Sequence, residues 1–290
     1  MKIPVLKKES TMQIEKLSPN FGAEVIGADL TCPVSDAVRK QLFDALHENI
    51  ALVIRDQNFT PDQYVAAGSI FGELMLKDQP EKYGLPGYPL VRVLNSQMKD
   101  SAGKVRSYKP NWHTDHTHLK VPPKYTMMYP VALPSQGGGT SFCNSRLGFE
   151  RLPVSLRNRI IDMKTVNVLS GSAAPNPTST SLEDMNEGNQ QTAVQPLVNT
   201  NPDHGGSKAI YFHLKKTENI IGMSPEDSQA FLADLLKIMD QPEVTYVHQW
   251  RMGDMLIWDN RSSMHKAGVD FDHNQLRMFN RMFVIGNDPN

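Results

Sequence analysis

Two short stretches of the chain carry residue types that together could bind a metal ion. His113 and Asp115 are separated by one residue, and a third candidate ligand, His265, follows much later in the chain. Side chains alternate faces along a strand, so His113 and Asp115 in a strand would point to the same side and could share one ion. Two imidazoles and one carboxylate can occupy one face of an octahedron and leave the other positions open, as in non-haem iron(II) oxygenases. The pattern therefore predicts a catalytic metal site at these three residues.

The His-x-Asp pair is informative only in its context. The chain has 9 histidines and 31 acidic residues among 290, so roughly one His-x-acid pair is expected by chance, and one is present. Residues 253–261 have the pattern of a strand followed by a polar turn, and we expect His265, Arg277 and Arg281 in the next strand. The two arginines are four residues apart, so in one strand they fall on the same face. A guanidinium in a shielded pocket binds a carboxylate through strong bidentate hydrogen bonds, which predicts two anion-binding groups near the metal.

The elements that must position these residues follow from hydrophobic patterning. Apolar residues at helical spacing, with polar N-caps, predict helices at 36–50, 61–71, 147–163 and 224–239. A hairpin is predicted within 12–31, and strands at 51–55, 90–94, 112–118, 124–133, 140–143, 194–199, 209–213, 243–250, 254–258 and 276–285. Helices early and mostly strands afterwards favour an α+β, mainly β fold, in which a sandwich or barrel carries flanking helices. We expect a single domain over residues 1–290.

Two segments lack a clear pattern of regular structure. Residues 75–110 are rich in Lys, Gly, Pro and Tyr, and residues 167–195 are dense in Ser, Thr, Asn, Gly and Pro. Long irregular segments of this kind are functional lids or poorly ordered loops. We predict that both are lid loops.

Bulk composition excludes several classes of partner. No apolar run approaches the roughly 20 residues of a membrane span, and the net charge is −1 with no basic stripe. Membrane and nucleic acid are therefore poor candidates as partners. Cys32 and Cys143 have neither metal-ligand spacing nor a disulfide framework, which favours the reducing cytoplasm.

Several short blocks, in this order and spacing, resemble the TauD/TfdA family, the taurine and 2,4-dichlorophenoxyacetate dioxygenases. The resemblance covers about residues 12–288. It implies a double-stranded β-helix (jelly-roll) core, Fe(II) as cofactor, 2-oxoglutarate and O2 as co-substrates, and release of succinate and CO2. It also implies hydroxylation or desaturation of a small anionic molecule by a homodimer or homotetramer. The blocks are Gly22–Thr31, Arg55–Gln57, Phe71–Leu74, Trp112–Asp115, Gly137–Thr140 and Trp258–Arg261.

The resemblance also implies roles for individual residues. The three candidate ligands match the iron ligands of the family. Thr140 and Arg277 match the pair that binds the distal carboxylate of 2-oxoglutarate, and Arg281 matches the arginine that meets an anionic group of the prime substrate. The interval from His265 to Arg277 is one residue longer than is typical of the family, so the division of roles between the two arginines stays open.

Further candidates lie on the substrate side. His116 follows the ligand aspartate directly, and Tyr108 is a candidate from the first lid. Lys77 and Lys109 stand where the taurine dioxygenases of the family place residues that receive the substrate amine. Two lysines would repel an amine and favour a second anionic group, although solvated loop lysines are the plainer interpretation. Five other histidines lack ligand spacing and are expected to be structural or exposed: His118, His204, His213, His248 and His273.

Two other functions remain open from the residues alone. Two histidines and a carboxylate with an open position also describe catalytic zinc, as in a zinc-dependent hydrolase. That interpretation gives Thr140, Arg277 and Arg281 no role. In a non-catalytic jelly roll that binds sugars or anions, the histidines would be structural.

Overall fold

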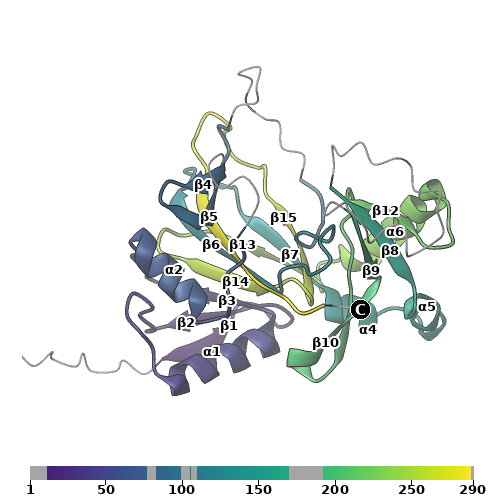
Figure 1. Cartoon of the computed structure of the whole chain (residues 1–290), viewed down its shortest axis with the longest axis horizontal. Helices are drawn as coiled ribbons and strands as arrows, with labels where there is room; N and C mark the ends of the chain where they lie inside the picture. Colours follow the sequence, from purple (N-terminus) through teal and green to yellow (C-terminus); the bar gives the residue numbers. More distant parts are fainter. Residues whose placement is uncertain (1–11, 77–82, 99–104, 106–109, 170–191, 289–290) are drawn as a thin grey trace, which may run out of the picture.

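The computed structural model describes residues 12–76, 83–98, 105, 110–169 and 192–288 (Figure 1). Its framework is an eight-stranded sheet, which we call the large sheet. All neighbouring strands in it are antiparallel except β2 and β3. In spatial order the strands are β1 (Gln13–Lys16), β2 (Ala23–Ile26), β3 (Ala51–Ile54), β14 (Met255–Asp259), β6 (Tyr125–Ala132), β16 (Met278–Val284), β5 (Tyr88–Asn95) and β4 (Gly84–Leu85).

A three-stranded sheet, the small sheet, packs against the inner face of the large sheet. It consists of β13 (Thr245–His248), β7 (Thr140–Asn144) and β15 (Ser263–Ala267). Phe142 of β7 lies in one buried cluster with Trp258 and Phe279 of the large sheet. The rings of Phe142 and Trp258 meet edge to face, with centroids 5.3 Å apart. Burial of these large rings between the sheets contributes on the order of 2–3 kcal/mol each.

Helices α1 (Asp36–Asn49) and α2 (Pro61–Ser69) cover the outer face of the large sheet. Each begins at a residue that caps it: the Ser35 hydroxyl accepts from the Val38 N–H, and Thr60 forms a capping box with Gln63. Strand β3 is buried along its whole length, because one face meets these helices and the other faces the small sheet.

The rest of the chain forms a second layer beside the small sheet, on the right of Figure 1. Its core packs against Cys143 and Met264 of the small sheet. The segment predicted as one helix at 147–163 forms two helices, because Pro153 has an extended backbone and donates no N–H. The elements are α4 (Ser145–Glu150), α5 (Val154–Ile160), α6 (Pro225–Met239), a 3₁₀ turn η1 (Pro202–His204), the sheet β12 (Thr217–Ile220), β8 (Lys164–Val168) and β9 (Thr192–Pro196), and the hairpin β10 (Val198–Asn201) and β11 (Ser207–Ile210).

Most predicted elements are confirmed, and one that matters for the site is wrong. In the predicted strand 112–118 only His113 forms β-bridges, and residues 115–118 form a turn. Four short strands, β4, β8, β12 and β15, were not predicted. Within the described ranges, no helix combines the length and the apolar character that crossing a bilayer requires.

Candidate active site

A cavity of about 1050 Å³ contains all three predicted metal ligands. Residues of β5, β6, β16 and the small sheet line it, together with the segment 113–118 and the turn 213–216. Among the described lining residues Asp115 is the only carboxylate, whereas four side chains are cations: Arg92, Lys216, Arg277 and Arg281. The cavity therefore favours anionic ligands.

The two histidine ligands lie opposite each other in a backbone pair. The N–H of His113 donates to the carbonyl of His265 at 3.0 Å, and the N–H of His265 donates to the carbonyl of His113 at 2.7 Å. Their ring centroids are 4.2 Å apart. Strand β15 places His265 against Phe142 of β7, and the Trp258 ring meets it edge to face. Close packing on both sides fixes the orientation of this imidazole.

Asp115 is the third candidate metal ligand. One ligand atom from each of the three residues lies within 4.8 Å of the others, and no second group of this kind occurs in the described part of the chain. His113 Nδ1 is 2.8 Å from the Asn111 carbonyl. Because a carbonyl only accepts, Nδ1 carries the proton and Nε2 offers its lone pair to a metal. The Thr126 hydroxyl donates to Asp115 Oδ2 at 2.7 Å, and Asn260 Nδ2 donates to that hydroxyl at 2.8 Å.

The electrostatics of the site fit a divalent cation. Burial lowers the pKa of His113 and lowers that of His265 to about 3, so both imidazoles are neutral at pH 7. Burial would raise the pKa of Asp115, but His265 and Arg281 outweigh it and hold that pKa well below its usual range. Two neutral imidazoles and one carboxylate are deprotonated at every ligand atom, which metal binding requires. The donor set fits Fe(II).

Thr140 and Arg277 meet at one end of the cavity. Arg277 Nη2 lies 3.5 Å from Thr140 Oγ1, and Arg277 Nε donates to the Gly138 carbonyl at 2.8 Å. Trp250 Nε1 also donates to Thr140 Oγ1, at 2.9 Å. Gly138 has φ = 68°, and a Cβ there would lie 3.2 Å from Arg277 Cδ. The glycine therefore allows both the left-handed backbone and the close approach of the arginine.

Arg281 lines the same cavity nearer to the metal ligands. Its Nη1 lies 3.7 Å from Asp115 Oδ1, and its buried Nε has no partner among the described residues. Arg277 and Arg281 share one side of the chain, as their spacing predicts. However, they lie before and within β16 of the large sheet, whereas His265 lies in β15 of the small sheet. The prediction that His265 and the two arginines share one strand is therefore wrong, and the candidate metal site bridges the two sheets.

The substrate-side candidates have mixed outcomes. His116 lines the cavity, with its ring edge to face on Phe283 at 4.7 Å and a left-handed φ of 54°. This conformation turns the chain after Asp115 and ends the extended stretch that was predicted. Lys77, Tyr108 and Lys109 lie outside the described residues.

Five lining residues with a cationic or imidazole side chain were not predicted to belong to the site. No spacing in the sequence signals them, because each reaches the cavity through a tertiary contact. For example, His213 forms an isolated β-bridge with His113, and their ring centroids are 4.9 Å apart. The five are Arg92, His118, His213, Lys216 and His273.

Thr126→Val is expected to weaken metal binding by roughly 10- to 100-fold, because it removes the hydrogen bond that orients the Asp115 carboxylate. Anaerobic titration of the apoprotein with Fe(II) measures the change. Thr117→Val is the matched control, since the Thr117 hydroxyl is also fully buried but has no partner in the described structure. Equal affinities for the two variants would show that the Thr126 hydroxyl does not support the metal site.

Comparisons with known proteins agree with this geometry. The family model described as "Taurine catabolism dioxygenase TauD, TfdA family" matches residues 13–283. An alkylsulfatase of Acinetobacter baylyi is 27% identical over 95% of this chain and 85% of its own length. A (S)-phenoxypropionate/alpha-ketoglutarate-dioxygenase of Sphingobium herbicidovorans is 28% identical over 95% of each chain. The crystal structure of AAD-2 in complex with Mn(II) and N-oxalylglycine superposes with a TM-score of 0.77 at 25% identity, over 97% of this chain and 99% of that one.

Proposed function

The chain belongs to the TauD/TfdA family of iron(II)- and 2-oxoglutarate-dependent dioxygenases, and we propose that it oxidises a small organic anion that Arg281 binds beside the metal. The double-stranded β-helix fold and the dependence on Fe(II) and 2-oxoglutarate, expected from the sequence, are confirmed. The observation that carries the proposal is the pair of arginines in a cavity whose described lining has one carboxylate.

The division of roles between the arginines follows from their neighbours. Arg277 lies beside the Thr140 hydroxyl, away from the ligand carboxylate, so this pair suits the distal carboxylate of 2-oxoglutarate. Arg281 lies beside Asp115 and has an unused Nε donor. It therefore suits an anionic group of the prime substrate. The names of two relatives, an alkylsulfatase and a phenoxypropionate dioxygenase, indicate anionic substrates for those proteins and support this class here.

The side chains hold the reactants and exclude water. His113, Asp115 and His265 would bind Fe(II), which supplies the activation of O2 that organic side chains cannot provide. Met128 and Phe271 are among the apolar residues of the wall, and a dry wall strengthens the ionic contacts of the arginines. We propose that the segments 75–110 and 167–195 act as lids over one domain. In support, described residues of both segments line the cavity: Tyr83, Met98, Val105 and Leu169.

The two alternatives account for less of the site. A zinc-dependent hydrolase has no use for the Thr140–Arg277 pair, and a purely structural role for the histidines leaves the convergent ligand atoms unexplained. Membership of a dioxygenase family argues against both.

Arg281→Met is expected to raise the KM of an anionic prime substrate by roughly tenfold, because it removes a charge-assisted hydrogen bond. A screen of sulfonates, aryloxyalkanoates and amino-acid-derived acids for substrate-stimulated succinate release would first identify such a substrate. The variant is then compared with the wild type for that substrate and for 2-oxoglutarate. If only the KM for 2-oxoglutarate increased, the roles assigned to the two arginines would have to be exchanged.

Location and assembly remain predictions. We propose a cytoplasmic protein, in keeping with Cys32 and Cys143, which are both free thiols in the described structure. We also propose a homodimer or homotetramer, which sedimentation of the purified chain would test.

A further inference from the structure

A rigid turn places two more polar side chains in the cavity. Residues 213–216 connect the segment after β11 to β12, and the N–H groups of Lys216 and Thr217 both donate to the His213 carbonyl, at 2.9 and 2.8 Å. The Thr217 hydroxyl accepts from the His213 N–H at 3.2 Å and donates to Asn167 Oδ1 at 2.8 Å. The turn is therefore fixed at the edge of the metal site.

His213 presents a hydrogen-bond donor from this turn. Its Nδ1 accepts from the backbone N–H groups of Lys215 and Lys216, at 3.2 and 3.3 Å. Nδ1 thus carries no proton, and in the neutral ring the proton lies on Nε2. Nε2–H is the polar group that His213 offers to the cavity.

Lys216 is a half-buried cation that makes no ion-pair contact with a carboxylate in the described part of the chain. Its Nζ lies 3.2 Å from His118 Nδ1, and no acidic oxygen of the described residues lies within ion-pair distance of it. An ammonium has three N–H donors, so two remain after the contact with His118. Burial lowers the pKa of Lys216 to about 8, which still leaves it mainly protonated at pH 7. Lys216 therefore lines the cavity as a cation with N–H donors that an anionic ligand would accept.

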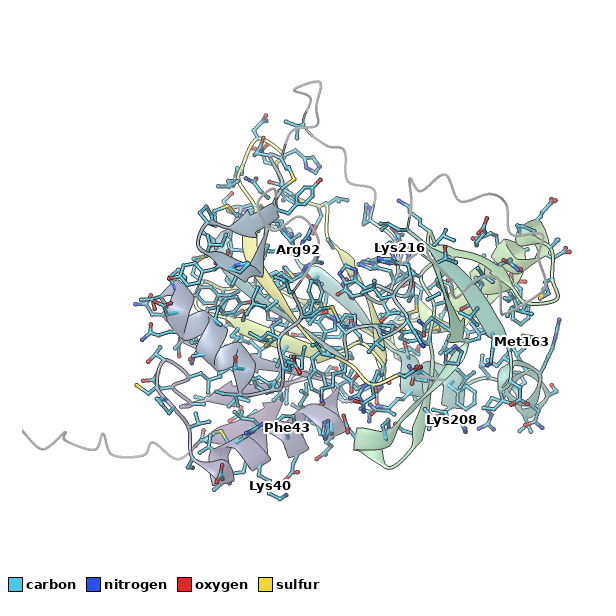
Figure 2. All side chains as sticks on the ribbon, in the orientation of Figure 1. Lys40, Phe43, Arg92, Met163, Lys208 and Lys216 are labelled. Atoms are coloured by element: carbon cyan, nitrogen blue, oxygen red, sulfur yellow. The ribbon has the colours of Figure 1, made fainter. Side chains whose placement is uncertain are left out.

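The two anion-binding positions come from different walls. Arg281 extends from β16 of the large sheet, whereas Lys216 extends from the layer that contains β8 and β12. Figure 2 shows Lys216 on that side, across from Arg92 of β5, and both line the same cavity. The charges of Fe(II) and of the 2-oxoglutarate dianion cancel. With both bound, the four cations and Asp115 would leave the cavity with more positive charge than one monoanionic substrate neutralises.

We propose that Lys216 and His213 form a second anion-binding site for the prime substrate, which is therefore a small organic dianion. One anionic group would contact Arg281 and the other Lys216 and His213. Because His213 packs against the ligand His113, the carbon chain between the two groups would pass next to the metal. The inference rests on the proposed function and narrows its substrate class.

The test uses the full chain loaded with Mn(II) and saturating N-oxalylglycine, so that Arg277 and Thr140 are occupied. Isothermal titration calorimetry compares straight-chain α,ω-dicarboxylates, from succinate to suberate, with monocarboxylates of the same length. At one or more lengths we expect the dicarboxylate to bind at least tenfold more tightly. Lys216→Met should abolish this preference and Lys216→Arg should retain most of it. Lys208→Met is the matched control, because Lys208 is exposed on β11 and away from the cavity (Figure 2).

The absence of any preference at every length, including an absence of binding, would overturn the proposal, as would a preference that survives in Lys216→Met. The comparison of dicarboxylates with monocarboxylates on the wild type tests the preference even if the methionine variant does not fold. The proposed function has a separate readout, the visible band that Fe(II) and 2-oxoglutarate give together without O2. A wild type with the band but no dianion preference would lack only the second site, whereas a wild type without the band would lack the dioxygenase site itself.

Discussion

Asp115→Ala is expected to lower 2-oxoglutarate-dependent succinate formation by at least about 10³-fold, equivalent to about 4 kcal/mol of lost transition-state stabilisation. Asp115 supplies the only carboxylate of the predicted metal site and the only negative charge of the described cavity lining. Its removal leaves two neutral imidazoles, and it leaves the Arg281 cation without its nearest anionic neighbour. Both changes weaken the binding of a divalent cation.

Succinate release under air, with Fe(II) and 2-oxoglutarate supplied, measures this effect. Asp234→Ala is the matched control, because Asp234 lies exposed on α6 and forms a surface ion pair with Lys237. The control should keep the wild-type rate. A variant at position 115 that folds normally and retains more than about a tenth of the wild-type rate would exclude Asp115 as an essential ligand.

Arg277→Ala is expected to raise the KM for 2-oxoglutarate by roughly 100-fold, since loss of one partner of a buried charge pair costs about 2–5 kcal/mol. The effect should concentrate on this co-substrate, because Arg277 lies beside Thr140 rather than beside Asp115. At saturating 2-oxoglutarate the variant should turn over at a rate within a few-fold of the wild type.

Initial rates of succinate formation across a range of 2-oxoglutarate concentrations give the KM for 2-oxoglutarate. Arg277→Lys should recover part of the affinity, because lysine keeps the charge but not the planar pair of donors. Arg151→Ala removes an exposed arginine at the end of α4 and should change nothing. An unchanged KM in Arg277→Ala would remove the role assigned to this residue.

The three candidate metal ligands, which the structure brings together, could be selected from the sequence, although one step of the reasoning was physically wrong. Strand alternation correctly placed His113 and Asp115 on one side, but the chain after His113 is not a strand. The shared direction comes from the backbone pair between His113 and His265 and from the left-handed turn at His116. The long-range partner, His265, was identified from the polar turn before it and the two arginines after it, and the resemblance to the family supported the same choice.

The missed part of the site has a different cause. His213 and Lys216 lie in a four-residue turn that reaches the metal site through hydrogen bonds to Thr217 and Asn167. Neither hydrophobic periodicity nor ligand spacing encodes such a contact, because it depends on how β8 and β12 pair. Strand β15 was missed for the same reason. Its pairing with β7, and not its composition, makes it a strand.

An anaerobic titration of the wild-type chain with Fe(II) and 2-oxoglutarate tests most directly whether the three candidate ligands bind one metal ion. The geometry of His113, Asp115 and His265 predicts one ferrous ion per chain and a weak visible charge-transfer band that needs both components and is lost in Asp115→Ala. A band that persists unchanged in that variant, or no band in the wild type at saturating Fe(II) and 2-oxoglutarate, would contradict the assignment.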